Sequence, residues 1–265
     1  MVVDIRNGRT DGSQKTDCEN PIDYLKKITN SKLTRYIQTH PDMDHLDGFS
    51  DLINTFGIMN FWDTKNNRSK PEDFAEYREI DWDSYKTDSK DYVHYFDRQT
   101  QSIVSSDGPY LYQLYPLNPT DELVKRANDT EGDCYNILSY VFLLCYKNCK
   151  ILFGGDIPDS IWTEIEEWRD NNLEAKTLLS NVNIFKASHH GRKSGYCENS
   201  FLKKINPRFI IADDNVPNDE SAYEQYQYYV DNREPSGWVY SVGKETVIAE
   251  YDENEGTTVG YVSQW

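Results

Sequence analysis

A cluster of histidine and aspartate residues follows an apolar run near the start of the chain. Residues 33–39 form the apolar run, and residues 40–48 then read His-Pro-Asp-Met-Asp-His-Leu-Asp-Gly. A strand that ends in such a tight loop directs several of these side chains into one small volume. Two imidazole nitrogens and two carboxylate oxygens make up most of a first coordination shell, so the pattern predicts a metal site rather than a solvated acidic loop. The candidate ligands are His40, Asp42, Asp44 and His45.

Two further clusters of the same residue types follow apolar runs later in the chain. Residues 137–146 and 150–153 lead to Gly154-Gly155-Asp156, and residues 182–186 lead to Ala187-Ser188-His189-His190-Gly191. An apolar strand that ends in Gly-Asp leaves the carboxylate at its tip, and the glycines let the backbone approach a ligand closely. If the strands are neighbours in sheets, the three tips converge. The sequence therefore predicts a two-metal site rather than a structural zinc site, which is usually closed by four ligands, mostly cysteines.

The order of these three motifs resembles the metallo-β-lactamase fold. Within that fold it is most similar to the soluble domain of ComEC-type competence proteins and their stand-alone relatives, which carry Asp where the better-known branch has its second His. The resemblance runs from about Val2 to Ile248. It includes residues 2–8, similar to an early strand whose Asp precedes a glycine turn near the site, and residues 136–141, similar to the strand before the Gly-Asp hairpin. It implies an α/β fold, a four-layer αββα sandwich.

The resemblance also implies a role for each matching residue. His40 and Asp42 are expected to bind one metal ion. Asp44, His45 and one imidazole of His189 or His190 are expected to bind the other, and Asp156 is expected to bridge both. A third ligand for the first ion is not evident in the sequence, and the candidates for it are His94, Asp133 and Asn136.

The ligand set predicts a hydrolytic reaction. Two divalent ions that share Asp156 would lower the pKa of a bridging water from about 15.7 towards neutrality and so supply a hydroxide nucleophile. Asp44 could orient that hydroxide or take its proton. Asp42 makes the shell richer in oxygen than a second imidazole would, which moves the metal preference from zinc alone towards manganese. Zinc and manganese both remain candidates.

Length and composition predict a single domain over residues 1–265, with residues 63–133 as an insertion or lid. The longest apolar runs are too short to span a membrane, and the start of the chain has no signal-like segment, so we expect a cytoplasmic protein without a membrane partner. The five cysteines are scattered and contain no Cys-x-x-Cys, as in a reducing compartment. The sequence gives no indication of the oligomeric state.

The net charge of −17 argues against a nucleic-acid binder that depends on a basic surface. It does not exclude phosphoester chemistry, since two metal ions place positive charge where the anion would lie. Lys186, Arg192 and Lys193 flank the His-His-Gly motif and could contact a phosphate, or could be ordinary surface charges. The aromatic residues 223–229 could line a pocket, although core packing is the more common role.

Hydrophobic periodicity predicts alternating helices and strands. The predicted helices cover residues 21–29, 46–56, 72–78, 121–127, 158–171, 199–205 and 221–230. The predicted strands cover residues 2–5, 33–39, 58–62, 110–115, 137–146, 150–153, 182–186, 208–212, 238–242, 245–251 and 259–262.

Together these features predict a metal-dependent hydrolase that cleaves phosphodiester bonds of a nucleic acid or nucleotide. One alternative is hydrolysis of a small ester, thioester or lactam. Another is a binding or regulatory module that keeps the fold but lacks activity, because the fold supports many functions.

Overall fold

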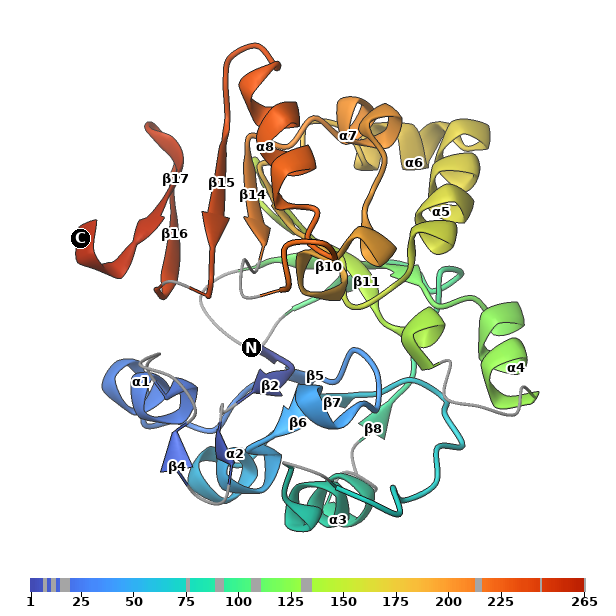
Figure 1. Ribbon diagram of the computed structural model, residues 1–265, viewed down its shortest axis with the longest axis vertical. Helices are drawn as coiled ribbons and strands as arrows, with labels where there is room; N and C mark the ends of the chain where they lie inside the picture. The colour runs from blue at the N-terminus through green and yellow to red at the C-terminus, as the bar shows by residue number, and fades with distance from the viewer. Residues whose placement is uncertain are drawn as a thin grey trace. The chain divides into compact units, whose positions relative to one another are not determined.

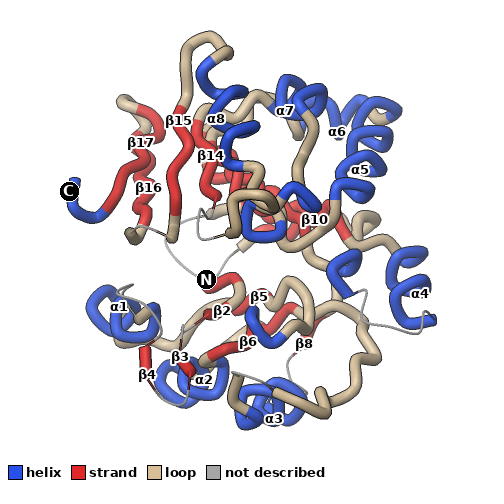
Figure 2. Tube along the Cα trace, in the orientation of Figure 1, coloured by secondary structure: helices blue, strands red, loops and turns tan. Residues whose placement is uncertain are grey.

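The computed structural model describes residues 1–6, 9–10, 13–14, 20–74, 77–88, 93–105, 111–129, 135–212, 216–243 and 245–264. The chain divides into two compact units, which we describe separately. Unit 1 comprises Met1–Asp97 and Pro119–Ser139, and unit 2 comprises Arg98–Asn118 and Tyr140–Trp265. Both units combine helices with sheets, so the predicted α/β class is confirmed (Figure 1, Figure 2).

Unit 1 is built on a parallel sheet in the order β1-β5-β7-β8, formed by Val2–Val3, Tyr36–Ile37, Phe61–Trp62 and Val93–His94. A second parallel pair joins β2 (Ile5–Arg6) to β6 (Leu46–Asp47), and β3 (Arg9–Thr10) pairs with β4 (Ser13–Gln14). The core beneath the sheet is aromatic: Tyr36 and Phe61 stack with ring centroids 5.5 Å apart. The helices of unit 1 are α1 (Pro21–Ile28), α2 (Phe49–Phe56), α3 (Glu79–Asp88) and α4 (Asp121–Asp129), with 3-10 turns at Met43–His45 and Tyr135–Leu138.

Unit 2 contains a seven-stranded sheet in the order β15-β14-β13-β12-β11-β10-β9. Side chains alternate across it: Phe185 of β13 contacts Trp162 and Tyr226, whereas its neighbour Ile184 packs in a cluster with Phe209 and Val259. Helices α5 (Asp159–Asn171) and α8 (Tyr223–Asp231) therefore cover one face, and the hairpin of β16 (Val247–Asp252) and β17 (Gly256–Tyr261) covers the other. The strands are Ile103–Val104 (β9), Gln113–Asn118 (β10), Val141–Tyr146 (β11), Cys149–Phe153 (β12), Ile184–Lys186 (β13), Phe209–Ala212 (β14), Trp238–Ser241 (β15), Val247–Asp252 (β16) and Gly256–Tyr261 (β17).

The helices of unit 2 are α5 (Asp159–Asn171), α6 (Leu173–Leu178), α7 (Asn199–Ile205) and α8 (Tyr223–Asp231). Short 3-10 turns lie at His189–Gly191, Lys193–Gly195 and Val262–Gln264. Tyr226 and Tyr229 of α8 are buried, so these two members of the aromatic run belong to the core. Among the described residues, no helix is both long and apolar enough to cross a membrane.

Several predicted boundaries are wrong. The helix predicted at residues 72–78 is not seen in residues 72–74, 77 and 78, and residues 75 and 76 lie outside the described residues. A helix forms at Glu79–Asp88, where Trp82 and Tyr85 supply the buried contacts. The helix predicted from residue 46 begins at Phe49, because Leu46–Asp47 pairs with β2 and Gly48 turns the chain with a φ of 95°. The strand predicted at residues 2–5 is interrupted at Asp4, whose φ is 49°. Residues 135–138, partly predicted as strand, form a 3-10 turn.

Candidate metal centre

In unit 1, a buried glutamine fixes the loop that carries the first motif. The side chain of Gln38 accepts a hydrogen bond from the Tyr36 hydroxyl at 2.8 Å. Its amide donates to the carbonyl of His40 at 2.6 Å and to the carbonyl of His45 at 3.3 Å. Gln38 and Tyr36 are fully buried. These bonds fix the backbone on both sides of the Asp42–Asp44 segment, so the loop is held independently of any ligand.

Asp4 orients the imidazole of His45. Its carboxylate accepts hydrogen bonds from the backbone N–H and the hydroxyl of Thr39, both at 2.7 Å, and lies 2.8 Å from Nδ1 of His45. An ionised carboxylate only accepts, so Nδ1 carries the proton and Nε2 presents its lone pair. This carboxylate–histidine arrangement is typical of metal-ligating histidines. Asp4 was not among the residues predicted for the site, although the resemblance of residues 2–8 to an early strand near the site was a signal.

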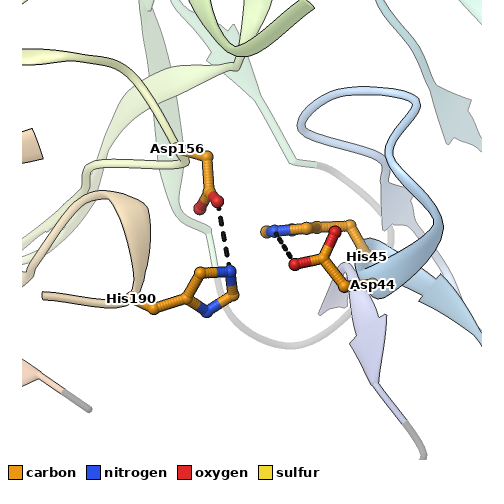
Figure 3. A group of neighbouring side chains, drawn as sticks. All are labelled: Asp44, His45, Asp156 and His190. Carbon is orange, nitrogen blue, oxygen red and sulfur yellow. Dashed lines mark ion pairs between the residues drawn. The ribbon is translucent and has the colours of Figure 1, made fainter. Parts of the chain in front are cut away.

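Nε2 of His45 points towards the carboxylate of Asp44, at a distance of 3.7 Å (Figure 3). The His45 side chain is nearly buried, whereas the Asp44 side chain is 28% exposed. The two side chains thus present one nitrogen and one carboxylate on the same side of the loop. Asp44 has the accessibility that a group exchanging protons with a substrate or water requires.

His40 and Asp42 have different partners. The single hydroxyl hydrogen of Thr39 goes to Asp4, so Nδ1 of His40, 3.1 Å from that hydroxyl, is the donor. Nε2 of His40 lies 3.5 Å from one oxygen of Asp42, and the other oxygen of Asp42 pairs with the guanidinium of Arg68. Ser139 Oγ lies 3.5 Å from Nδ1 of His40. Sequence reasoning identified neither Arg68 nor Ser139 as a neighbour of the motif.

Two of the candidates for a further ligand can be placed. His94 is exposed on β8, and its ring stacks on Phe96 with centroids 6.1 Å apart. Asn136 lies in the 3-10 turn that precedes Ser139. Asp133 lies outside the described residues.

In unit 2, the ends of two parallel strands bring Asp156 and His190 together. β12 and β13 are parallel neighbours, so the segments that follow them lie at the same sheet edge. The hydroxyl of Ser188 donates to the carbonyl of Gly154 at 3.0 Å and accepts from Trp162 Nε1 at 3.1 Å. A Cβ on Gly154 would lie 2.3 Å from Ser188 Oγ, so only glycine permits this approach.

His190 is the imidazole that faces Asp156. Its Nε2 lies 3.2 Å from the Asp156 carboxylate, drawn as a dashed line in Figure 3. His189 and His190 have φ values of 50° and 56°, and this left-handed turn separates their rings by 6.4 Å. His189 instead places Nδ1 2.9 Å from the hydroxyl of Ser194. The sequence left both histidines open, and this geometry favours His190.

The three basic residues near this motif all have protein partners. Nζ of Lys186 donates to the carbonyl of Ala187 at 3.2 Å, and Nζ of Lys193 donates to the carbonyl of Asp219 at 2.8 Å. Arg192 pairs with Glu220. A phosphate contact from any of them stays a prediction.

No protein-family model matches the chain, and no curated protein is significantly similar to it. Among solved structures, the metallo-β-lactamase-fold protein YhfI from Bacillus subtilis is similar over 91% of this chain and 84% of its own, with 9% identity and a TM-score of 0.46. A protein described as a metal-dependent hydrolase from Parabacteroides distasonis is similar over 80% and 77%, with 12% identity and a TM-score of 0.41.

CmlA, a diiron β-hydroxylase from Streptomyces venezuelae, shares 11% identity over 68% of this chain, with a TM-score of 0.37. The chain spans about a third of the length of CmlA, since the match covers 35% of it. All three TM-scores lie below 0.5, so these similarities assign neither a family nor a substrate.

Proposed function

We propose that the chain is a metal-dependent hydrolase in which Asp44 and His45, together with Asp156 and His190, bind a divalent metal ion. Each of the four offers one nitrogen or oxygen ligand atom. Asp44 and His45 belong to unit 1, and Asp156 and His190 belong to unit 2. That one ion takes ligands from both pairs is what the sequence resemblance implies. The observation that carries the proposal is the orientation of His45, whose Nδ1 is held by Asp4 so that Nε2 is available as a ligand. Two imidazoles and two carboxylates suit zinc or manganese.

When bound, such an ion lowers the pKa of a coordinated water and polarises the oxygen of the bond under attack. The protein supplies the remaining functions. Asp4 holds the tautomer of His45, and the turn at His189–Gly191 sets the direction of His190. Asp44 is the most exposed carboxylate of the group and is placed to orient a water molecule or to accept its proton.

For the substrate we propose a phosphodiester of a nucleic acid or nucleotide. The support is the sequence resemblance together with the charge of the chain. At a net charge of −17, an anionic substrate would be repelled by the protein surface as a whole, so a bound cation is the group best able to attract it. A small ester, thioester or lactam is the second candidate, because a neutral substrate would not meet that repulsion.

We also propose that the protein resides in the cytoplasm. Cys145, Cys149 and Cys197, the cysteines in the described part of the chain, have free thiols. Burial raises the pKa of the Cys197 thiol well above its ordinary value, which keeps it protonated and unreactive. Free thiols fit the reducing cytoplasm.

Hydrolysis of bis(p-nitrophenyl) phosphate with added manganese or zinc tests the proposal. The wild type should turn over the substrate only with metal, and the variant Asp44→Ala/His45→Ala should lose at least about 100-fold in kcat/KM, because two ligands are removed. Glu250→Ala, an exposed carboxylate on β16, is the control and should match the wild type.

Equal turnover by the wild type and the double variant would contradict the assignment of these ligands. Hydrolysis of p-nitrophenyl acetate without hydrolysis of the phosphodiester would favour the small-ester enzyme. A protein that binds metal but hydrolyses neither compound would be the inactive binding module.

A further inference from the structure

We infer that a pocket within unit 1 binds a small phosphorylated molecule that carries a planar ring, as a nucleoside monophosphate does. The pocket has a volume of about 510 Å³, which suits a small organic ligand rather than a single ion. It is lined by residues 63–67, which follow β7, and by side chains from α3, α4 and the end of β8. None of these is a candidate metal ligand, so the inference goes beyond the proposed function and does not depend on it.

Hydrogen bonds hold the wall that residues 63–67 form. Nδ2 of Asn66 donates to the hydroxyl of Tyr85 on α3 at 2.9 Å. The side chain of Asn128 on α4 accepts from the backbone N–H of Asn67 at 2.9 Å and donates to the carbonyl of another wall residue, Lys65, at 2.8 Å. The wall is therefore fixed in the absence of a ligand, and a ligand that enters has little protein structure to order.

The charged residues among those that line the pocket favour an anion. They are Lys65, Lys86 and Asp63, in a chain whose net charge is −17. The carboxylate of Asp63 accepts from the backbone N–H of Thr64 at 2.8 Å and from the hydroxyl of Tyr85 at 2.7 Å. Burial also raises the pKa of Asp63 to about 7, so part of the population carries no charge there at neutral pH. The lining is thus positive on balance, and an anion gains from it.

Lys86 is held at the wall of the pocket. Its Nζ lies 4.8 Å from the ring centroids of both Trp82 and Tyr85, and 3.4 Å from Oδ1 of Asn66. Asn66 and Tyr85 are themselves lining residues, so the ammonium group stands beside the cavity. The described lining residues include two lysines and no arginine. Lysine binds phosphate as a point charge, whereas a planar carboxylate is matched best by the paired N–H groups of arginine. Two lysines also suit the double charge of a phosphate monoester.

The ring of Tyr95 offers a surface for a planar group. Tyr95 follows β8 and is 46% exposed, whereas Tyr85 on the same pocket is almost fully buried. An accessible aromatic ring near ammonium groups is the combination that binds a base by stacking and its phosphate by charge. Apart from Val93, the lining side chains are polar or aromatic, so the ligand they suit is polar as well.

Isothermal titration calorimetry of the full chain with AMP, GMP, CMP and UMP tests the inference. The titrations are done in EDTA, so that no ion at the candidate metal centre contributes and a failure leaves the proposed function standing. At least one nucleotide should bind saturably with a Kd below about 1 mM. Ribose 5-phosphate, which has the phosphate but no base, should bind at least about 5-fold more weakly. The matching nucleoside, which has no phosphate, should lose at least about 10-fold.

Substitutions assign the binding to the pocket. Lys65→Met and Lys86→Met remove a charge while keeping most of the side-chain length, and each should raise the Kd by about 10-fold. Tyr95→Leu should raise it by about 5-fold. Lys125→Met replaces an exposed lysine of α4 that does not line the pocket, so this matched control should keep the wild-type Kd.

No saturable binding of any of the four nucleotides would overturn the inference. Equal affinity for ribose 5-phosphate would overturn the role of the planar ring, and equal affinity for the nucleoside would overturn the role of the phosphate. Circular dichroism shows whether Lys86→Met is folded. If it is not, the exposed positions Lys65 and Tyr95 provide the test, and wild-type affinity in both of those variants would place the nucleotide outside the pocket.

Discussion

At the scale of single residues, Asp4 links the fold to the proposed chemistry. It lies at the break between β1 and β2 with a positive φ, and its carboxylate receives three hydrogen-bond donors from the first motif. The break in the strand therefore has a consequence for the site. In a continuous strand the Asp4 side chain would point to one face of the sheet. Because the strand is broken at Asp4, the side chain points towards Thr39 and His45 instead.

Replacing Asp4 should weaken metal binding without removing a ligand. In Asp4→Ala, Nδ1 of His45 loses its acceptor, so the ring can change tautomer and rotate. We expect about 10- to 100-fold weaker metal affinity. Competition with a chromophoric chelator measures it, with circular dichroism to show that the variant is folded. Unchanged affinity in a folded Asp4→Ala would contradict the role of Asp4.

Asp63 should make stability depend on pH. Burial raises the pKa of Asp63 to about 7, although the Tyr85 hydroxyl donates to it at 2.7 Å. Between about pH 4 and 7 the folded state keeps a proton that the unfolded state releases, so the free energy of unfolding falls as pH rises, by up to about 1.4 kcal/mol per pH unit. Below about pH 4 this contribution is constant.

Asp63→Asn isolates this effect, since asparagine keeps the shape but does not titrate. Urea titration measures the free energy of unfolding of both proteins. The value for the wild type minus the value for the variant should fall as pH rises towards 7 and become constant above pH 7. A difference that is independent of pH would show that Asp63 is ionised throughout.

At the scale of elements, regular periodicity was a good guide where local sequence and packing agree. Helix α7 was predicted with its observed bounds, and α1 and α4 differ from their predictions by at most two residues. The helix predicted at residues 72–78 is not seen in its described residues. A helix forms at Glu79–Asp88 instead, because burial of Trp82 and Tyr85 depends on the core of unit 1, which a local pattern does not contain. Helix α6 was not predicted; Asn172 caps its first turn.

The junction between β12 and β13 should be sensitive to a single methyl group. In Gly154→Ala the added Cβ would meet Ser188 Oγ at 2.3 Å and the Lys186 carbonyl at 2.9 Å. We expect a loss of about 1–3 kcal/mol in the free energy of unfolding. Gly256→Ala is the comparison: no atom lies within 4 Å, so only its φ of +85° opposes alanine, and the loss should be smaller. Equal losses would contradict the steric account.

At the scale of the whole molecule, the sequence identified the candidate ligands better than their partners. Asp44, His45, Asp156 and His190 are recognisable because each follows an apolar run and belongs to a short motif. Arg68 was missed because it belongs to no motif, and Ser139 was missed as a neighbour of His40 although it lies within residues 136–141, which carry part of the resemblance. Only folding of unit 1 brings them together. The single domain and the four-layer arrangement stay predictions, since each concerns both units at once.

The most direct test of the central claim is a crystal structure of the manganese-loaded protein with anomalous scattering data. The account predicts a strong manganese peak that is coordinated by Asp44, His45, Asp156 and His190. An ion bound away from these four residues, or no ion at saturating manganese, would contradict the account.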